Sequence, residues 1–96
     1  MATFSLTIQA ASDVDEIWEY IAESNIDAAD RVLAELYAAM KKLAEMPGIG
    51  SLKPKLADAR HRFWVVTPYV IVYRSDTRPL QIIRVIHGAR DLGSLL

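Results

Sequence analysis

The side chains best able to do chemistry lie together near the C-terminal end of the sequence. An apolar, β-branched run at residues 80–86 carries Arg84 in its middle, and His87, Arg90 and Asp91 follow it directly. Histidine titrates near neutral pH and can act as a general acid or base, while arginine binds carboxylates and phosphates through its planar guanidinium. We therefore expect a site for catalysis or recognition at the exit of a central strand that is covered on both faces.

Each of these side chains also has a structural interpretation. His87 can hydrogen-bond to neighbouring backbone at the strand end, and we favour this interpretation because the only carboxylate close to it in sequence is Asp91. Arg84 is surrounded by apolar residues and needs a partner, because an unpaired buried charge is costly. We expect an ion pair with Asp91 or with a glutamate on a helix, unless Arg84 serves recognition instead. Arg90 and Asp91 are expected to be exposed.

Length and composition exclude several classes of protein. The 96 residues suit one domain, spanning residues 1–96. There are two histidines and no cysteine, and the histidines lack the helical spacing of a metal site, so we expect neither metal nor cofactor. The lack of cysteine is compatible with a reducing compartment, and no signal peptide or membrane-spanning run is visible. We therefore expect a cytoplasmic location without membrane association.

Charge is distributed unevenly along the chain. Residues 1–59 contain five Lys/Arg and ten Asp/Glu, a net −5, whereas residues 60–96 contain six Arg, no Lys and two Asp, a net +4. The arginine-rich half is therefore expected to present the surface that binds a partner. The whole chain has a net charge of −1 and a pI near 6.1, so we expect no direct nucleic-acid binding by the chain alone.

The elements that must position the candidate residues follow from hydrophobic periodicity. Residues 3–9 alternate in the pattern of a strand with one buried face. A first helix is expected to begin after Ser12 as its N-cap. A second helix is expected at residues 28–46, with Asp27 as its N-cap and Asn25 in a left-handed cap between the two helices. Two helices joined so closely should form an antiparallel hairpin.

Three strands are expected in quick succession, at residues 60–66, 69–75 and 80–87, after a loop at residues 51–59. Their links are short, so neighbouring strands must be antiparallel. The predicted fold class is therefore α+β, with the order β-α-α-β-β-β and the N-terminal helical hairpin packed on one face of a small antiparallel sheet. The tail at residues 91–96 is either a helical turn or an arm that docks on a partner.

Four stretches of the sequence resemble the RelE/ParE superfamily of bacterial type II toxins, and specifically its ParE branch. They cover nearly the whole chain, and the resemblance implies the same β-α-α-β-β-β arrangement. In order, the stretches are Asp15-Glu16-Ile17-Trp18-Glu19-Tyr20-Ile21-Ala22, Leu43-Ala44-Glu45-Met46-Pro47 with Gly50, Pro68-Tyr69-Val70-Ile71-Val72-Tyr73-Arg74, and Arg84-Val85-Ile86-His87-Gly88-Ala89-Arg90-Asp91.

The superfamily contains two activities, and single positions distinguish them. RelE-like members cut messenger RNA on the ribosome, whereas ParE-like members are described as poisons of DNA gyrase without catalytic activity. RelE-like nucleases typically carry Gly-Tyr-Arg before the strand centre and end with Arg-Asp-Val-Tyr. This chain has Pro68-Tyr69-Val70 and Arg90-Asp91-Leu92-Gly93 instead, so that arginine and that tyrosine are missing. The resemblance therefore implies a toxin that binds gyrase and traps it on cleaved DNA.

Two alternatives remain open at this point. The first is a ribosome-dependent mRNA endonuclease, for which a cation and a titrating group would come from Arg62, Arg84, His87 and Arg90. The second is a non-toxic member that only binds the antitoxin, because function in one fold depends on a few residues.

The resemblance also implies a partner that neutralises the toxin. A cognate antitoxin is expected to fold a C-terminal segment across the helical hairpin and the sheet, and the basic half of the chain fits an acidic segment. Without that partner the toxin could form a homodimer that covers the same surface. The residues expected to bind the target or the antitoxin combine the polar cluster with exposed residues of the hairpin: Arg62, Arg84, His87, Arg90, Asp91, Tyr20, Tyr37 and Met40.

Overall fold

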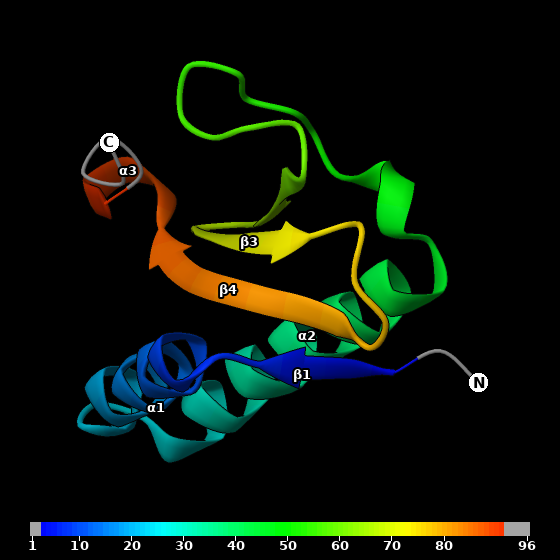
Figure 1. Ribbon diagram of the computed structural model, residues 1–96. Coiled ribbons are helices and arrows are strands. Elements are labelled where there is room, and N and C mark those ends of the chain that lie inside the picture. Colours follow the sequence, from blue (N-terminus) through cyan, green and yellow to red (C-terminus); the bar gives the residue numbers. More distant parts are fainter. Residues whose placement is uncertain (1–2, 92–96) are drawn as a thin grey trace.

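The computed structural model describes residues 3–91 and confirms the predicted α+β class and the order β-α-α-β-β-β (Figure 1). A 3-10 turn, η1, follows the second helix, and a short helix, α3, follows the last strand. Of the tail predicted at residues 91–96 as a helical turn or an arm, Asp91 ends α3, and residues 92–96 lie outside the described residues. The elements are β1 (Phe4–Leu6), α1 (Ile8–Ala22), α2 (Ile26–Glu45), η1 (Pro47–Ile49), β2 (His61–Val66), β3 (Tyr69–Arg74), β4 (Leu80–His87) and α3 (Gly88–Asp91).

The four strands form one sheet in the order β1-β4-β3-β2, so β4 lies in its interior. The pairs β2–β3 and β3–β4 are antiparallel, but β1 runs parallel to β4, with Phe4 opposite Leu80 and Leu6 opposite Ile82. The prediction of a wholly antiparallel sheet is therefore wrong for β1. Short links fix the relative direction only of the strands that they join, and the helical hairpin and two strands separate β1 from β4 along the chain.

Helix α1 begins earlier than predicted. Thr7, and not Ser12, is its N-cap, because the Thr7 hydroxyl accepts a hydrogen bond from the Ala10 backbone N–H at 3.0 Å. The alternating pattern suggested that the strand continues through Ile8, yet Ile8 starts the helix and its side chain is 91% exposed. The early start places Asp13 inside α1, which matters for the site described below.

Helix α2 also begins earlier than predicted, at Ile26. Asn25 is its N-cap, with extended backbone at φ −162°, and its side chain accepts a hydrogen bond from the Ala28 N–H at 2.9 Å. The predictions of Asn25 in a left-handed cap and of Asp27 as N-cap are both wrong. Asp27 lies in the first turn instead, where its negative charge interacts favourably with the helix dipole.

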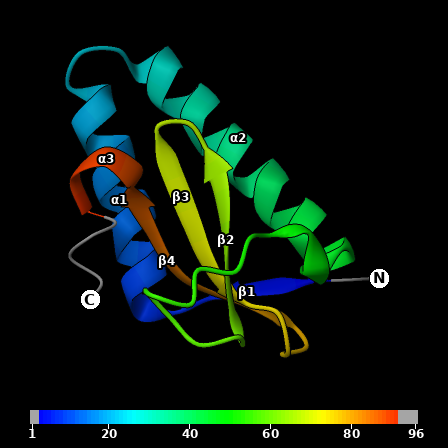
Figure 2. The ribbon, with the colours of Figure 1, turned by 90° about the horizontal axis from the view of Figure 1, so that it is seen from above.

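The main core lies between the sheet and the helical hairpin. Figure 1 shows both helices on one side of the sheet, and Figure 2 shows them behind the strands, joined at one end by their short link. Leu36, Met40 and Leu43 of α2 are fully buried in this core because their spacing places them on one stripe that faces the sheet. The prediction of Met40 as an exposed binding residue is therefore wrong.

The opposite face of the sheet is covered by the loop at residues 51–59. Leu56 and Ala57 of this loop pack on a second cluster of buried side chains from β2, β3 and β4. The members of that cluster from the three strands are Phe63, Val70, Val72 and Ile86. The prediction that β4 is a central strand covered on both faces is therefore confirmed.

A β-bulge in β4 changes which side chains face the helices. The pairing of β3 with β4 leaves an extra residue in β4 between Ile82 and Arg84. Strand side chains normally alternate between the two faces, and one extra residue reverses that alternation. Ile82 and Val85 consequently both belong to the core beneath the helices. His87, two residues after Val85, lies on the same side of the sheet as the helices.

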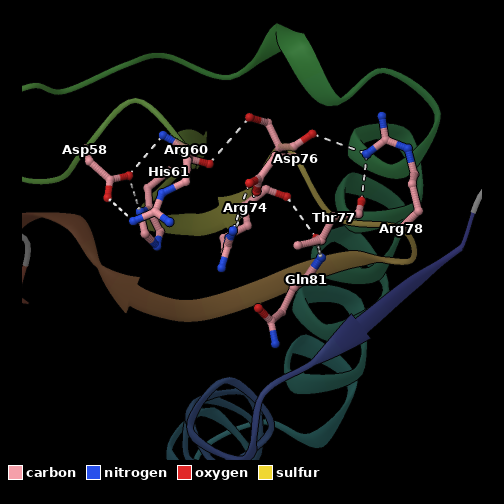
Figure 3. A network of polar contacts seen from close by, with 9 residues as sticks. Asp58, Arg60, His61, Arg74, Asp76, Thr77, Arg78 and Gln81 are labelled. Atoms are coloured by element: carbon pink, nitrogen blue, oxygen red, sulfur yellow. Dashed lines mark hydrogen bonds and ion pairs between the residues drawn. The ribbon is translucent and has the colours of Figure 1, made fainter.

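Exposed ion pairs organise the connections at the end of the sheet opposite His87. Asp58 pairs with Arg60, and Arg74 pairs with Asp76, each at 2.8 Å (Figure 3). The hydrogen bond from Arg60 lowers the pKa of Asp58, and the hydrogen bond from Arg74 lowers the pKa of Asp76. Exposed pairs add little to stability because water screens them. These contacts therefore order a loop and a turn and do not anchor the core.

Candidate functional site

Five of the eight predicted binding residues line one pocket of about 420 Å³. The pocket lies between α1, the last part of β4, the start of β3 and α3. Its lining mixes charged groups with two tyrosines and several aliphatic side chains. The lining residues are Asp13, Glu16, Ile17, Tyr20, Tyr69, Arg84, Val85, Ile86, His87, Arg90 and Asp91.

Arg84 is held by a carboxylate from α1. Its Nε donates to Asp13 Oδ2 at 2.7 Å and its Nη2 donates to Asp13 Oδ1 at 3.1 Å. The hydrogen bond to Asp13 raises the pKa of Arg84. The predicted ion pair therefore exists, but both expected partners, Asp91 and a helix-borne glutamate, are wrong. The true partner follows from the early start of α1, which brings Asp13 against β4.

His87 is placed by backbone and ring contacts at the end of β4. Its Nδ1 accepts a hydrogen bond from the Arg90 backbone N–H at 3.3 Å, so the neutral ring carries its proton on Nε2. The ring also meets Tyr69 edge to face, with centroids 5.9 Å apart. The predicted bond between His87 and neighbouring backbone is therefore confirmed.

Gly88 allows β4 to turn directly into α3. Its N–H donates to the Pro68 carbonyl at 2.9 Å, and a Cβ at this position would lie only 3.1 Å from a methyl group of Val70. The Asp91 carboxylate then accepts a hydrogen bond from the His87 N–H at 3.3 Å. The turn thereby brings the polar residues after the strand back over the pocket.

The charges around the pocket nearly balance. Two arginines and three carboxylates line it, giving a net charge of −1 when His87 is neutral. Arg84 is already paired with Asp13. Within residues 3–91, neither the guanidinium of Arg90 nor the carboxylate of Glu16 forms an ion pair or a hydrogen bond. The pocket therefore presents separate charges of both signs and no cluster of cations.

The other three predicted residues lie outside this pocket. Arg62 of β2 donates from Nη1 to the Gly50 carbonyl at 2.8 Å and so supports the segment after η1. Tyr37 of α2 is 40% exposed, as predicted, with its ring 6.0 Å from that of Phe4. Met40 is buried in the core.

Six lining residues were not among the predicted binding residues: the apolar Ile17, Val85 and Ile86, and Tyr69, Glu16 and Asp13, which carry polar groups. Tyr69 belongs to the core, with 8% exposure, and it also lines the pocket. Glu16 is exposed on α1. Asp13 is the sixth residue of α1, because Thr7 is the N-cap. Recognising Thr7 as the N-cap would have placed Asp13 beside β4.

Comparison with known proteins places this arrangement in a defined class. The model of the ParE toxin of type II toxin-antitoxin system, parDE, matches residues 4–92. The chain is 33% identical over 92 residues to Toxin ParE1 of Caulobacter vibrioides, which covers 95% of this chain and 94% of that protein. It is 37% identical over 91 residues to Toxin RelE2 of the same organism, and this alignment covers 94% of this chain and 99% of that protein.

A solved structure shows the same fold. A chain in the chromosomal ParDE TA system from P. aeruginosa superposes with a TM-score of 0.73 at 21% identity, covering 91% of this chain and 96% of that chain. The fold and the family match together define a type II toxin of the RelE/ParE superfamily. Within that superfamily, the chain belongs to the ParE toxin family.

Membership in this family confirms the predicted superfamily and its ParE branch, and it implies a cognate antitoxin as a partner. A separate finding concerns membranes. In the described part of the chain, no helix has both the length and the apolar character needed to cross a bilayer.

Proposed function

We propose that this toxin binds DNA gyrase and traps it on cleaved DNA in the cytoplasm, and that its cognate antitoxin neutralises it. The observation that carries the proposal is the pairing of Arg84 with Asp13, with side-chain exposures of 32% and 13%. This pair compensates the charge of Arg84, one of the two arginines that line the pocket, and so disfavours a role for it in binding a phosphate. The pocket residues bind a protein partner instead.

The distribution of cations disfavours the nuclease alternative. RNA cleavage through the 2′-hydroxyl needs a base, an acid and positive charge at the phosphorane. Of the arginines considered for that role, Arg62 is bonded to Gly50 outside the pocket and Arg84 is paired. Arg90 is left as the single unpaired arginine of the pocket among residues 3–91, and His87 already uses Nδ1 to accept a backbone N–H.

A protein target suits the shape and chemistry of the same pocket. Tyr20 lies at the pocket and is 71% exposed, and aromatic side chains of this kind often anchor protein interfaces. Glu16 and Arg90 form no ion pair within residues 3–91 and add one charge of each sign, which favours a partner that offers complementary side chains. The antitoxin is expected to compete for this surface by covering the helical hairpin and the sheet.

Two purified reactions test the proposal. In the first, supercoiled plasmid is incubated with gyrase and ATP, with and without the toxin, and linear DNA is measured after protein removal. In the second, a cell-free translation reaction contains the toxin, and the message is probed for cuts. Linear plasmid with intact message is the expected result. Message cut only on ribosomes, with gyrase unaffected, would overturn the proposal.

A matched pair of arginine variants links the first reaction to the pocket. Arg90→Gln removes the pocket cation that forms no ion pair within residues 3–91, and it should raise the toxin concentration needed for half-maximal linearisation about tenfold. Arg31→Gln makes the same change at an exposed position of α2 outside the pocket and should have little effect. Equal effects of the two variants would show that the pocket does not bind the target.

A further inference from the structure

The Asp13 carboxylate on α1 binds both the side chain and the backbone of β4, and it also lines the pocket. Its two oxygens accept hydrogen bonds from Arg84 Nε, from Arg84 Nη2 and from the Val85 backbone N–H, the last at 2.9 Å. We propose that Asp13 is a positioning residue, which orients Arg84 for a protein ligand and prevents the pocket from binding polyanions. The test of this proposal by gyrase inhibition rests on the proposed function. The tests by NMR and by RNA binding do not.

The first argument is the geometry of the guanidinium. A carboxylate that accepts from both Nε and Nη2 fixes the plane and the direction of the guanidinium. Nη1 forms no hydrogen bond with any residue in 3–91, and Arg84 lines the pocket. A ligand therefore meets the Arg84 guanidinium in one orientation. The charge of this guanidinium is largely compensated by the Asp13 carboxylate, which is only 13% exposed.

The second argument is the edge of β4 on the side of β1. Strand β1 pairs with β4 only as far as Ile82. Beyond that point, the Thr7 hydroxyl donates to the Ile83 carbonyl at 2.8 Å and Asp13 accepts from the Val85 N–H. The side chains of α1 and its cap thus replace the missing neighbouring strand. The position of α1 and the orientation of Arg84 are consequently linked through one residue.

The third argument is electrostatic. With Asp13 ionised, the lining of the pocket has a net charge of −1, which repels a phosphate backbone. Without that charge, Arg84 and Arg90 would both be available as cations on the same pocket. Neutralising Asp13 should therefore weaken recognition of a protein ligand that needs the fixed guanidinium, and strengthen binding to single-stranded RNA.

The test compares Asp13→Asn with Asp15→Asn in the full chain. An asparagine at position 13 keeps an oxygen that can accept from the Val85 N–H, but it loses the charge and the second strong acceptor. Asp15 is exposed on the same helix and lies outside the pocket, so Asp15→Asn makes the same change in net charge without touching Arg84. Three measurements then follow on each variant.

The first measurement is direct and needs no target. In proton–nitrogen NMR spectra, the Arg84 Nε–H should exchange slowly with water in the parent and in Asp15→Asn, and much faster in Asp13→Asn. Equal exchange in all three proteins would overturn the positioning role, whatever the target of the toxin.

The second measurement is binding to a single-stranded oligouridylate at several salt concentrations. Asp13→Asn should bind more tightly than Asp15→Asn, and its plot of log K against log salt should be steeper by about 0.7, the slope of one more phosphate contact on a single strand. Identical binding by the two variants would overturn the role in excluding polyanions.

The third measurement is gyrase inhibition in a double-mutant cycle. Asp13→Asn should weaken inhibition roughly tenfold in the parent and have little further effect in a chain that already carries Arg84→Gln, because both changes remove one interaction. Independent, additive losses would show that Asp13 acts on inhibition without Arg84. If the parent does not inhibit gyrase, the proposed function fails, and the first two measurements still decide the role of Asp13.

Discussion

The Tyr73 hydroxyl offers the sharpest test of how the segment after α2 is held. Tyr73 of β3 has no exposed surface, and its hydroxyl donates to the Pro47 carbonyl at 2.7 Å and accepts from the Gly50 N–H at 2.9 Å. Tyr73→Phe keeps the ring and removes only the oxygen. The Pro47 carbonyl in η1 and the Gly50 N–H directly after η1 then lose their hydrogen-bond partner.

The expected cost follows from these two contacts. A buried polar group that loses its hydrogen-bond partner costs about 1–3 kcal/mol, so two groups at the lower end give about 2 kcal/mol of lost stability. For a domain of this size, each 1 kcal/mol lowers Tm by roughly 4–8 °C, so the variant should melt roughly 8–16 °C below the parent.

Urea unfolding followed by tryptophan fluorescence measures the free energy of unfolding directly. The matched control is Tyr20→Phe, which removes a hydroxyl from a tyrosine that is 71% exposed and makes no hydrogen bond within residues 3–91. The control should stay within about 0.5 kcal/mol of the parent, as surface substitutions usually do. A loss for Tyr73→Phe that is no larger than the control's would refute the assignment of Tyr73 as the residue that holds η1.

Three further predictions concern the same core. Gly50→Ala should destabilise the protein by more than 1 kcal/mol, roughly the cost of overpacking, because a Cβ there would overlap the Tyr73 hydroxyl; Gly48→Ala, whose Cβ would meet nothing within 4 Å, is the control in the same urea experiment. Met40→Ala should lower the free energy of unfolding by about 2–5 kcal/mol, because it removes a fully buried side chain, and a loss below about 1 kcal/mol in chemical unfolding would contradict its place in the core. Burial raises the pKa of Tyr73, so the folded state holds its phenolic proton more tightly than the unfolded state. The protonated phenol therefore stabilises the folded state below about pH 10, the usual pKa of tyrosine, and this contribution is lost as the pH rises further. The difference in free energy of unfolding between the parent and Tyr73→Phe should consequently narrow above this pH.

Periodic patterns in the sequence predicted most of the fold because they record which face of each element is buried. Strand β4 was predicted at residues 80–87 and is found at Leu80–His87. The helical hairpin and the three consecutive strands followed from the same signal, and the end of β4 brings Arg84, His87 and Arg90 to one pocket. These features depend on local sequence, which a single chain displays directly.

The features that the sequence did not predict depend on contacts between distant segments. The parallel pairing of β1 with β4 and the β-bulge in β4 leave no local periodic signal. The ion pair of Asp13 with Arg84 joins residues 71 positions apart, and it requires the true start of α1. That start was missed because Thr7 and Ser12 are both plausible caps, and only the hydrogen bond to the Ala10 N–H distinguishes them.

The pairing of β1 with β4 limits when the protein can fold during its synthesis. Thr7 and Ile83, which are bonded across this junction, lie 76 positions apart. At about 5–20 residues per second, roughly 4–15 s separate the synthesis of β1 from that of β4, the strand with which it pairs. Until β4 has been made, the helical hairpin lacks the strand that contributes Leu80, Ile82 and Val85 to the core. Arg84 and His87 are absent for the same time. A ribosome-bound chain therefore cannot form the pocket until its last strand has been made, and until then the apolar side of the helical hairpin is open to contact with other proteins.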